Sequence, residues 1–315
     1  MRTIRFFLPL AMLALLLVGN ATTTRTARHT SALAAEKHSQ QGTKKAATTD
    51  ADRIERLLAD LLPLRSKLSK EDMILKVARH FIGIPYVAHT LDRNSEETLV
   101  VNTREMDCTT YLENVIAVLL CVDRNQSRFS DFTRMLQSIR YRQGHLSYEN
   151  RLHYYQWWVT DNQQMGFVKE IETPNPPFTA TQRLKINYMS ENYKSYDMLR
   201  NHPKRVAALK KIEDQTNGTV VRYIPKSQLT NTALLRKVVR NGDIIAITTN
   251  KRNLDTTHLG FAVWHSDRLH LLNASSLKKN GRQVVEPKET LYQYLMQRQQ
   301  NPGIRVARLI FDNLC

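Results

Sequence analysis

A cysteine stands directly behind an acidic residue and ahead of an apolar stretch in NTREMDCTTYLENVIAVLLC, residues 102–121. Asp107 is a residue type that caps helices, and apolar residues follow Cys108 at spacings of three and four. The pattern predicts a helix from Cys108 to Asp123, with Cys108 at its N-terminal end on the buried face. Unpaired amides and the helix dipole lower the pKa of a thiol in such a position. Cys108 is therefore a candidate nucleophile, and the alternative is a small core residue.

A histidine and an asparagine follow in two runs with strand-like composition, THLGFAVW and LHLLNAS. A hairpin with a four-residue loop at 265–268 sets a register that places His258 and Asn273 on one face, roughly 7 Å apart. Gly260 leaves room between them, and the helix that begins at Cys108 is expected to pack on this face. Together the three residue types fit a nucleophile, a base and an orienting group. The alternative is a hydrogen-bonded polar pair at the end of a sheet.

The first half of the chain has helical patterns, and the second half has strand patterns. Helices are predicted in DRIERLLADLLPL and, after Ser69, in SKEDMILKVARHFIG, and a short strand is predicted in ETLVVN, residues 97–102. Residues 125–215 indicate polar helices interrupted by ETPNPPFTAT. Short β-branched runs follow, namely GTVVRYI, GDIIAITT, THLGFAVW, LHLLNAS, RQVVEP and IRVARLIF, with helices in NTALLRKVV and KETLYQYLMQRQ. This order predicts an α+β fold with an antiparallel sheet.

The N-terminus is typical of an exported protein. Arg2 and Arg5 precede an apolar stretch that ends in small residues, so residues 1–21 are predicted to be a signal peptide cleaved near Ala21. The alternative is an uncleaved membrane anchor, and no later segment is long and apolar enough to span a membrane. Residues 22–50 are predicted to be a flexible linker, and residues 51–315 a single domain with a helical insertion at about 125–215.

Charge and cysteine content restrict the partners. The 315 residues carry a formal net charge of +17, of which about +12 follows residue 50. An exported basic protein is attracted to anionic polymers such as the cell wall, and no nucleic-acid motif is visible. Cys108 and Cys121, on one predicted helix, lie roughly 20 Å apart and cannot form a disulfide. Because metal-binding patterns such as His-Glu-x-x-His and Cys-x-x-Cys are missing, no metal and no cofactor is expected.

Four segments carry a resemblance to a known family: GIPYVAHTL, VVNTREMDCTTYLENVIAV, THLGFAVW and LLNASS. They resemble the N-acetylmuramoyl-L-alanine amidase-like branch of the NlpC-type cysteine peptidases, over roughly residues 70–315. The resemblance implies a circularly rearranged papain-like fold and peptidoglycan hydrolysis, with Cys108 as nucleophile, His258 as base and Asn273 as the orienting residue. Relatives often have histidine at the third position, so Asn273 departs in type but keeps the orienting hydrogen bond. Tyr86 resembles a tyrosine that flanks the cysteine in such enzymes.

Two further residues are candidate substrate contacts. Tyr86 is expected to bind substrate or to stabilise an oxyanion, and the alternative is a half-buried tyrosine beside a proline turn. His153 lies in the aromatic segment NRLHYYQWW, which is either a substrate platform or core. The predicted protein is an exported, periplasmic cysteine amidase that cuts between N-acetylmuramic acid and L-alanine. A peptidase acting within the stem peptide, an acyltransferase, and a wall-binding module without turnover are the alternatives, and nothing indicates an oligomeric state.

Overall fold

The computed structural model describes residues 48–266 and 268–314, which belong to one compact unit. The predicted signal peptide and nearly all of the predicted linker lie outside the described residues. The described helices are α1 Asp50–Leu61, α2 Lys70–His80, α3 Cys108–Asp123, α4 Phe129–Arg140, α5 Tyr155–Gln164, α6 Tyr188–Glu191, α7 Asp197–Arg200, α8 Pro203–Thr216, α9 Thr232–Leu235 and α10 Leu291–Met296. None of the helices in these two ranges has both the length and the apolar character needed to cross a membrane.

The strands form one antiparallel sheet in the order β2-β3-β8-β4-β5-β6-β7, and β1 also pairs with β8. They are β1 Val168–Ile171, β2 Ala180–Arg183, β3 Val220–Pro225, β4 Ile244–Thr248, β5 Thr256–His265, β6 Arg268–Ala274, β7 Val284–Val285 and β8 Gly303–Leu309. The predicted α+β fold with an antiparallel sheet is confirmed, and the six strands predicted in the second half are β3 to β8. The region 125–215 is not purely helical, because it also contributes β1 and β2 to the sheet.

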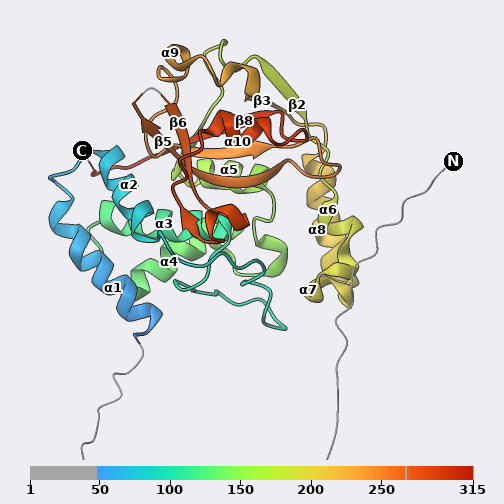
Figure 1. The fold of residues 1–315 in the computed structure, drawn as a ribbon. Helices are drawn as coiled ribbons and strands as arrows, with labels where there is room; N and C mark the ends of the chain where they lie inside the picture. The colour runs from blue at the N-terminus through green and yellow to red at the C-terminus, as the bar shows by residue number, and fades with distance from the viewer. Residues whose placement is uncertain (1–47, 267, 315) are drawn as a thin grey trace, which may run out of the picture. The chain divides into compact units, whose positions relative to one another are not determined.

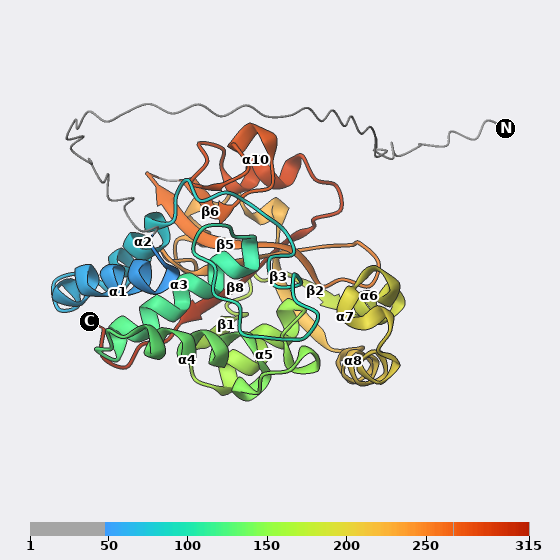
Figure 2. The same cartoon turned by 90° about the horizontal axis from the view of Figure 1, so that it is seen from below.

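The sheet is covered on both faces. Ile244 and Ala246 of β4 pack into a core built mainly with α1 to α5, whereas Ile245 and Ile247 pack into a second core with residues of α9 and α10. This alternation follows from the strand geometry, which points successive side chains to opposite faces. Figure 2 shows α10 and the group α3, α4 and α5 on opposite sides of β5 and β6. Figure 1 shows α1 to α4 gathered below β5 and β6, and α6 to α8 grouped apart from them below β2 and β3.

Helix α3 is the central element of the first core. It runs from Cys108 to Asp123, as predicted, and every residue from Thr110 onward is buried. The spacing had predicted one buried face, but the helix is enclosed all round by α1, α2, α4 and the sheet. Cys121 is fully buried in it, and both Cys108 and Cys121 are free thiols, as their separation predicted.

A carboxylate fixes the C-terminal end of α3. The Asp123 side chain accepts hydrogen bonds from the backbone N–H groups of Asp312, Asn313 and Leu314 at 3.3, 2.8 and 2.9 Å. Arg65 donates to the Asp123 backbone oxygen at 2.9 Å and covers the negative end of the helix dipole. One residue therefore ties the end of the chain to the central helix.

The strand predicted in ETLVVN, residues 97–102, is wrong: this segment is an extended loop without strand pairing. Side chains of α4 and the residue after it hold this segment instead of a neighbouring strand: Arg140 donates to the Val100 carbonyl at 2.6 Å, and the Tyr141 hydroxyl donates to the Glu97 carboxylate at 2.6 Å. Composition alone does not indicate whether the backbone groups of such a segment bond to another strand or to side chains.

The Asp123 contacts give a test of this architecture. Replacing Asp123 by alanine leaves three backbone N–H groups without their acceptor, so we expect the free energy of unfolding in urea to fall by about 2 kcal/mol. The matched control is Asp60→Ala, at an exposed position of α1, which should change stability by less than about 0.5 kcal/mol. Equal stability of the two variants would contradict the anchoring role.

Candidate active site

Cys108 is the first residue of α3, as predicted. The N-cap Asp107 accepts a hydrogen bond from the Thr110 backbone N–H at 2.8 Å, and the Thr110 side chain accepts one from the Asp107 N–H at 2.9 Å. This reciprocal capping fixes where the helix begins. The N–H groups of Cys108 and Thr109 belong to the first turn, which has no intrahelical acceptors, so they are available to a negatively charged oxygen.

The hairpin of β5 and β6 has the predicted register but a shorter connection. Trp264 pairs with Leu269, as expected, but His265 also pairs with Arg268, so only two residues connect the strands instead of four. Pairing between β5 and β6 ends at Phe261 and Leu272, and β6 continues beside β7. Beyond Phe261 and Leu272 the two strands no longer pair with each other, so polar side chains can lie between them.

Gly260 permits the close approach predicted for this position. A Cβ atom placed on Gly260 would lie 2.7 Å from the Leu272 carbonyl oxygen and 3.0 Å from the Asn273 Cβ atom. Both distances are shorter than ordinary contacts, so a side chain at this position would push β6 and Asn273 away from His258.

His258 and Asn273 form a hydrogen bond, with 2.9 Å between His258 Nε2 and Asn273 Oδ1. The buried Asn273 also donates from Nδ2 to the Leu271 carbonyl at 2.8 Å, which fixes the orientation of the amide. Because Oδ1 can only accept, His258 Nε2 must carry the proton and Nδ1 is left with a lone pair. The pair therefore selects the tautomer that can accept a proton at Nδ1.

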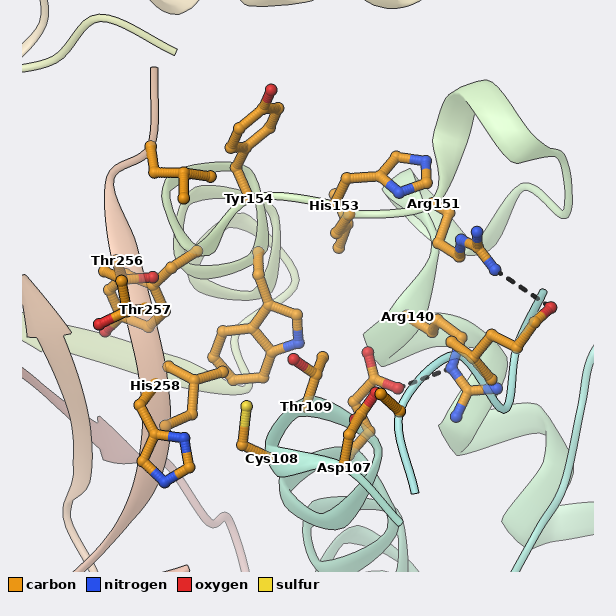
Figure 3. Close-up of a pocket in the computed structure, with 18 of the residues that line it drawn as sticks. Asp107, Cys108, Thr109, Arg140, Arg151, His153, Tyr154, Thr256, Thr257 and His258 are labelled. Atoms are coloured by element: carbon orange, nitrogen blue, oxygen red, sulfur yellow. Dashed lines mark hydrogen bonds and ion pairs between the residues drawn. The ribbon is translucent and has the colours of Figure 1, made fainter. Parts of the chain in front are cut away.

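The sheet face that carries His258 is opposite to the predicted one. His258 pairs with Ile247, whose side chain packs in the core on the α10 side, whereas the core around α3 takes Leu259 and Phe261. Cys108 still meets His258 because the thiol is at the end of α3, next to the backbone of Leu259, whose N–H bonds to it. Figure 3 shows Cys108 and His258 side by side at one end of a cavity.

This cavity has a volume of about 410 Å³ and brings several predicted site residues together. Cys108, His258, Tyr86 and His153 all line it, and Asn273 lies behind His258. Its other walls come from the loop at 88–92, from α5 and its approach at 151–158, and from the start of β5 at 254–259. In the described part of the chain, no group of three His, Cys, Asp or Glu side chains is placed to hold a metal ion.

The expectation of a lowered thiol pKa is wrong. Burial and the nearby Asp107 charge raise the pKa of Cys108 to about 12, and the N–H of Leu259 and the hydroxyl of Thr109 oppose this only partly. Burial likewise lowers the pKa of His258, against the hydrogen bond that its Nε2–H donates to Asn273. Both changes favour neutral forms, because the surroundings of the site are poor in water. At neutral pH the site therefore contains a thiol and a neutral imidazole.

Two tyrosines flank the thiol. Burial and the Cys108 thiol raise the pKa of Tyr86 to about 12, so its hydroxyl stays protonated and can donate a hydrogen bond. Its backbone is held between Arg282 and Met106, two residues before Cys108. Tyr294 of α10 stacks beside His258, with ring centroids 6.2 Å apart. The sequence analysis missed Tyr294, because the helical pattern did not indicate which face of α10 meets the sheet.

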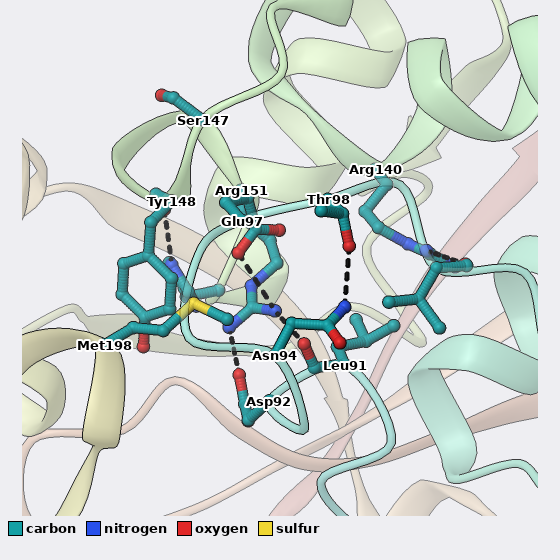
Figure 4. Close-up of polar contacts among 12 residues, drawn as sticks. Leu91, Asp92, Asn94, Glu97, Thr98, Arg140, Ser147, Tyr148, Arg151 and Met198 are labelled. Atoms are coloured by element: carbon teal, nitrogen blue, oxygen red, sulfur yellow. Dashed lines mark hydrogen bonds and ion pairs between the residues drawn. The ribbon is translucent and has the colours of Figure 1, made fainter.

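The end of the cavity away from Cys108 is charged. Arg140 donates from Nε to Glu113 at 2.6 Å, and both side chains are 2% exposed. Arg151 contacts Asp92, lies 3.5 Å from Glu97 and covers the ring of Tyr148 at 4.6 Å (Figure 4). The contacts of Arg151 hold the loop at 88–105 against the segment that precedes α5, and the pair of Arg140 and Glu113 joins α4 to α3. Sequence reasoning missed them, because each joins residues far apart in the chain.

His153 lies near this charged end (Figure 3). Its Nε2 atom is 2.9 Å from the Tyr148 carbonyl oxygen and must carry the proton, so Nδ1 remains an acceptor. Burial and the positive charge of Arg151 lower the pKa of His153 to about 3, so the ring is neutral. The position allows the predicted contact with substrate, through Nδ1 or the ring.

A cysteine at a helix start, beside a histidine oriented by an asparagine, is a layout that thiol hydrolases use. The chain belongs to the AmiA-like family, described as N-acetylmuramoyl-L-alanine amidase-like, whose model matches residues 76–304. The predicted resemblance is thus confirmed at the level of the family. A search of curated proteins gave no match.

Solved structures agree with this membership. An N-acetylmuramoyl-L-alanine amidase from Bacteroides uniformis is 38% identical over 76% of this chain and 98% of its own, with a TM-score of 0.70. A Bacteroides fragilis protein provisionally named a xylanase is also 38% identical, over 74% of this chain and 99% of its own, with a TM-score of 0.68. A Legionella pneumophila protein of family DUF1460 is similar in fold, with 22% identity over 84% and 96% and a TM-score of 0.65.

The raised thiol pKa predicts how Cys108 reacts without substrate. Iodoacetamide reacts with the thiolate, so we expect the alkylation rate to rise about tenfold per pH unit from pH 7 to pH 10, without a plateau, because the pKa lies near 12. Mass spectrometry of the peptide that contains Cys108 follows the reaction, and Cys108→Ala provides the blank. A plateau at neutral pH would instead indicate a thiolate paired with protonated His258.

Proposed function

We propose that this protein hydrolyses the amide bond between N-acetylmuramic acid and L-alanine in peptidoglycan, with Cys108 as nucleophile, His258 as general base and Asn273 as the residue that orients it. The observation that carries the proposal is the hydrogen-bonded pair of His258 and Asn273, which leaves Nδ1 free beside the Cys108 thiol in one cavity. Membership in the amidase-like family and the 38% identical amidase from Bacteroides uniformis support the proposed scissile bond and the proposed substrate.

Because Cys108 and His258 are both neutral, the reaction begins with a proton transfer between them. His258 Nδ1 takes the thiol proton as the Cys108 sulfur bonds to the carbonyl carbon, so charge develops only when substrate is in place. The carbonyl oxygen becomes an oxyanion, and the N–H groups of Cys108 and Thr109 at the start of α3 stabilise it. The protonated Tyr86 hydroxyl is a further candidate donor, because Tyr86 lines the same cavity. When substrate displaces water from the site, these donors replace the hydrogen bonds that the water made to the carbonyl oxygen.

The second half of the reaction returns the protons. Protonated His258 gives its proton to the nitrogen of L-alanine, the C–N bond breaks, and the free stem peptide leaves. A thioester between Cys108 and the lactyl carbonyl remains. Water then attacks this thioester while His258 takes one of its protons, and the sulfur leaves with that proton as the thiol forms again. Asn273 keeps the imidazole in one tautomer and one orientation through both halves.

The position of the cysteine helix and the strand pair also supports a papain-like, NlpC-type arrangement of the fold. The N-terminal 21 residues support export, and a periplasmic location follows from the substrate, which lies outside the cytoplasm. Fusion of these residues to a reporter enzyme that is active only after export would test the location.

A glycosidase is a weaker assignment for this cavity. Glycoside hydrolysis generally needs two carboxyl groups flanking the sugar bond. The carboxylates that line this cavity already serve other groups: Asp107 caps α3, Glu113 pairs with Arg140, Asp92 pairs with Arg151, and Asp255 accepts from the backbone of Gln156. The amidase assignment uses groups that are free to react.

The first experiment is digestion of muropeptides with the protein and with Cys108→Ala, followed by mass spectrometry. We expect free stem peptides that begin with L-alanine, and a loss of at least about a thousandfold in the variant because the nucleophile is missing. Fragments cut within the stem peptide would instead assign a peptidase with the same mechanism. Binding to sacculi without any products would favour a wall-binding module, and full activity of Cys108→Ala would exclude the thiolate mechanism.

The role of Asn273 has its own test. Asn273→Ala should lower kcat about tenfold to a hundredfold with little change in KM, because the imidazole loses its oriented tautomer. Asn273→Asp keeps an acceptor and adds a negative charge that favours the imidazolium, so the acid limb of the pH-rate profile should move to higher pH.

The matched control is Asn192→Ala, at an exposed position near α6. It should leave both kcat and the pH profile unchanged. An acid limb that stays in place in Asn273→Asp would show that Asn273 acts only in packing.

A further inference from the structure

A second hollow, of about 560 Å³, begins at the proposed general base. His258 and Thr257 line both this hollow and the first cavity. The remaining walls come from the segment after β6 at 276–277, from Tyr294 of α10, and from the segment 297–301 that leads into β8. The two hollows therefore meet at the site where the scissile bond would lie.

The two hollows differ in chemistry. The first contains both signs of charge, with Arg151 paired with Asp92 and Arg140 paired with Glu113. The second is lined by the amide side chains of residues 297 and 299–301 together with hydroxyl groups, and Arg298 is its charged side chain. Among the described residues that line the second hollow, none carries a carboxylate.

Two amides of the second hollow are free to bind a ligand. The Gln299 and Gln300 side chains are exposed, whereas Gln297 contacts Lys279 at 3.1 Å and Glu289. Arg298 is not free in the same way, because it lies 3.6 Å above the Tyr294 ring and donates to the Tyr294 carbonyl at 2.7 Å. Gln299 and Gln300 thus offer donors and acceptors to an uncharged polar ligand.

The backbone that carries these amides is firmly held. Asn301 donates from Nδ2 to the Thr248 carbonyl and to the Thr257 hydroxyl, both at 2.8 Å. The Gln300 carbonyl accepts from the Asn250 N–H at 2.8 Å. Because this backbone is already ordered, little conformational entropy would be lost on binding, as expected for a preformed site.

We propose that the second hollow binds the sugar part of the substrate through Gln299 and Gln300, and that the charged first cavity binds the stem peptide. The inference rests on the proposed function and assigns a direction to the substrate. An acetylated amino sugar is neutral and presents hydroxyl and amide groups, which match side-chain amides as both donors and acceptors. A stem peptide carries ionised groups of both signs, which match the first cavity. The amide bond that joins them then crosses the junction at Cys108 and His258.

The test compares two substrates that share the same lactyl amide and stem peptide: a muropeptide, and the stem peptide acylated by lactic acid without any sugar. The ratio of their kcat/KM values measures what the sugar contributes. In the double variant Gln299→Ala, Gln300→Ala we expect this ratio to fall about tenfold, because sugar contacts are lost. The matched control, Gln164→Ala at an exposed position at the end of α5, should leave the ratio unchanged.

The outcomes separate the two proposals. If the wild-type protein cleaves neither substrate at the lactyl amide, the proposed function fails and this assignment fails with it. If the muropeptide is cleaved but the double variant keeps the wild-type ratio, the hydrolase stands and the sugar site is wrong. A wild-type ratio near one would also overturn the sugar site. Unchanged thermal unfolding of the double variant confirms that any loss comes from binding.

Discussion

The burial of helix α3 is the constraint on which the site depends. The helix is enclosed from Thr110 to Asp123, so its position and rotation are set by contacts on every side. A carboxylate stabilises each end of the helix: Asp107 caps the first turn, and Asp123 accepts hydrogen bonds from backbone N–H groups near residue 313. Cys108 stands at the one end of this rigid element that opens into a cavity. A thiol placed in this way has little freedom to leave its position, which suits the proposed role in a reaction that depends on alignment.

Burial also determines the charge of Cys108 and His258. Burial raises the thiol pKa of Cys108 and lowers the imidazole pKa of His258, so both groups are neutral without substrate. A neutral thiol is a weak nucleophile and resists oxidation better than a thiolate. In the proposed mechanism, activation then requires substrate, whose carbonyl oxygen takes up the developing charge against the helix N-terminus. The hydrogen bond between His258 and Asn273 needs no charge to keep the imidazole ready for this step.

The two hollows differ in charge, because the first is lined by charges of both signs and the second by no carboxylate of the described residues. Ion pairs are costly to bury, and here Arg140 pairs with Glu113 between α4 and α3, whereas Arg151 pairs with Asp92 where the loop at 88–105 meets the segment before α5. They give the first cavity fixed charges of both signs. The second hollow uses amides on a backbone tied to β4 and β5. Both hollows use the sheet as a common support, and the reactive groups lie at their junction.

Local patterns in the sequence determined the helix from Cys108 to Asp123, the register of β5 with β6, the six later strands and the membership in the amidase-like family. These depend on caps, spacing and alternation, which act between near neighbours in the chain. The strand predicted at 97–102 failed, β1 and β2 were missed, and His258 lies on the other face of the sheet, because each depends on which distant segment packs there. The raised pKa of Cys108, the position of Tyr294 and the pairing of Arg151 with Asp92 likewise arise only after burial. Desolvation and long-range ion pairs have no local signature, and for that reason the tertiary structure alone decided them.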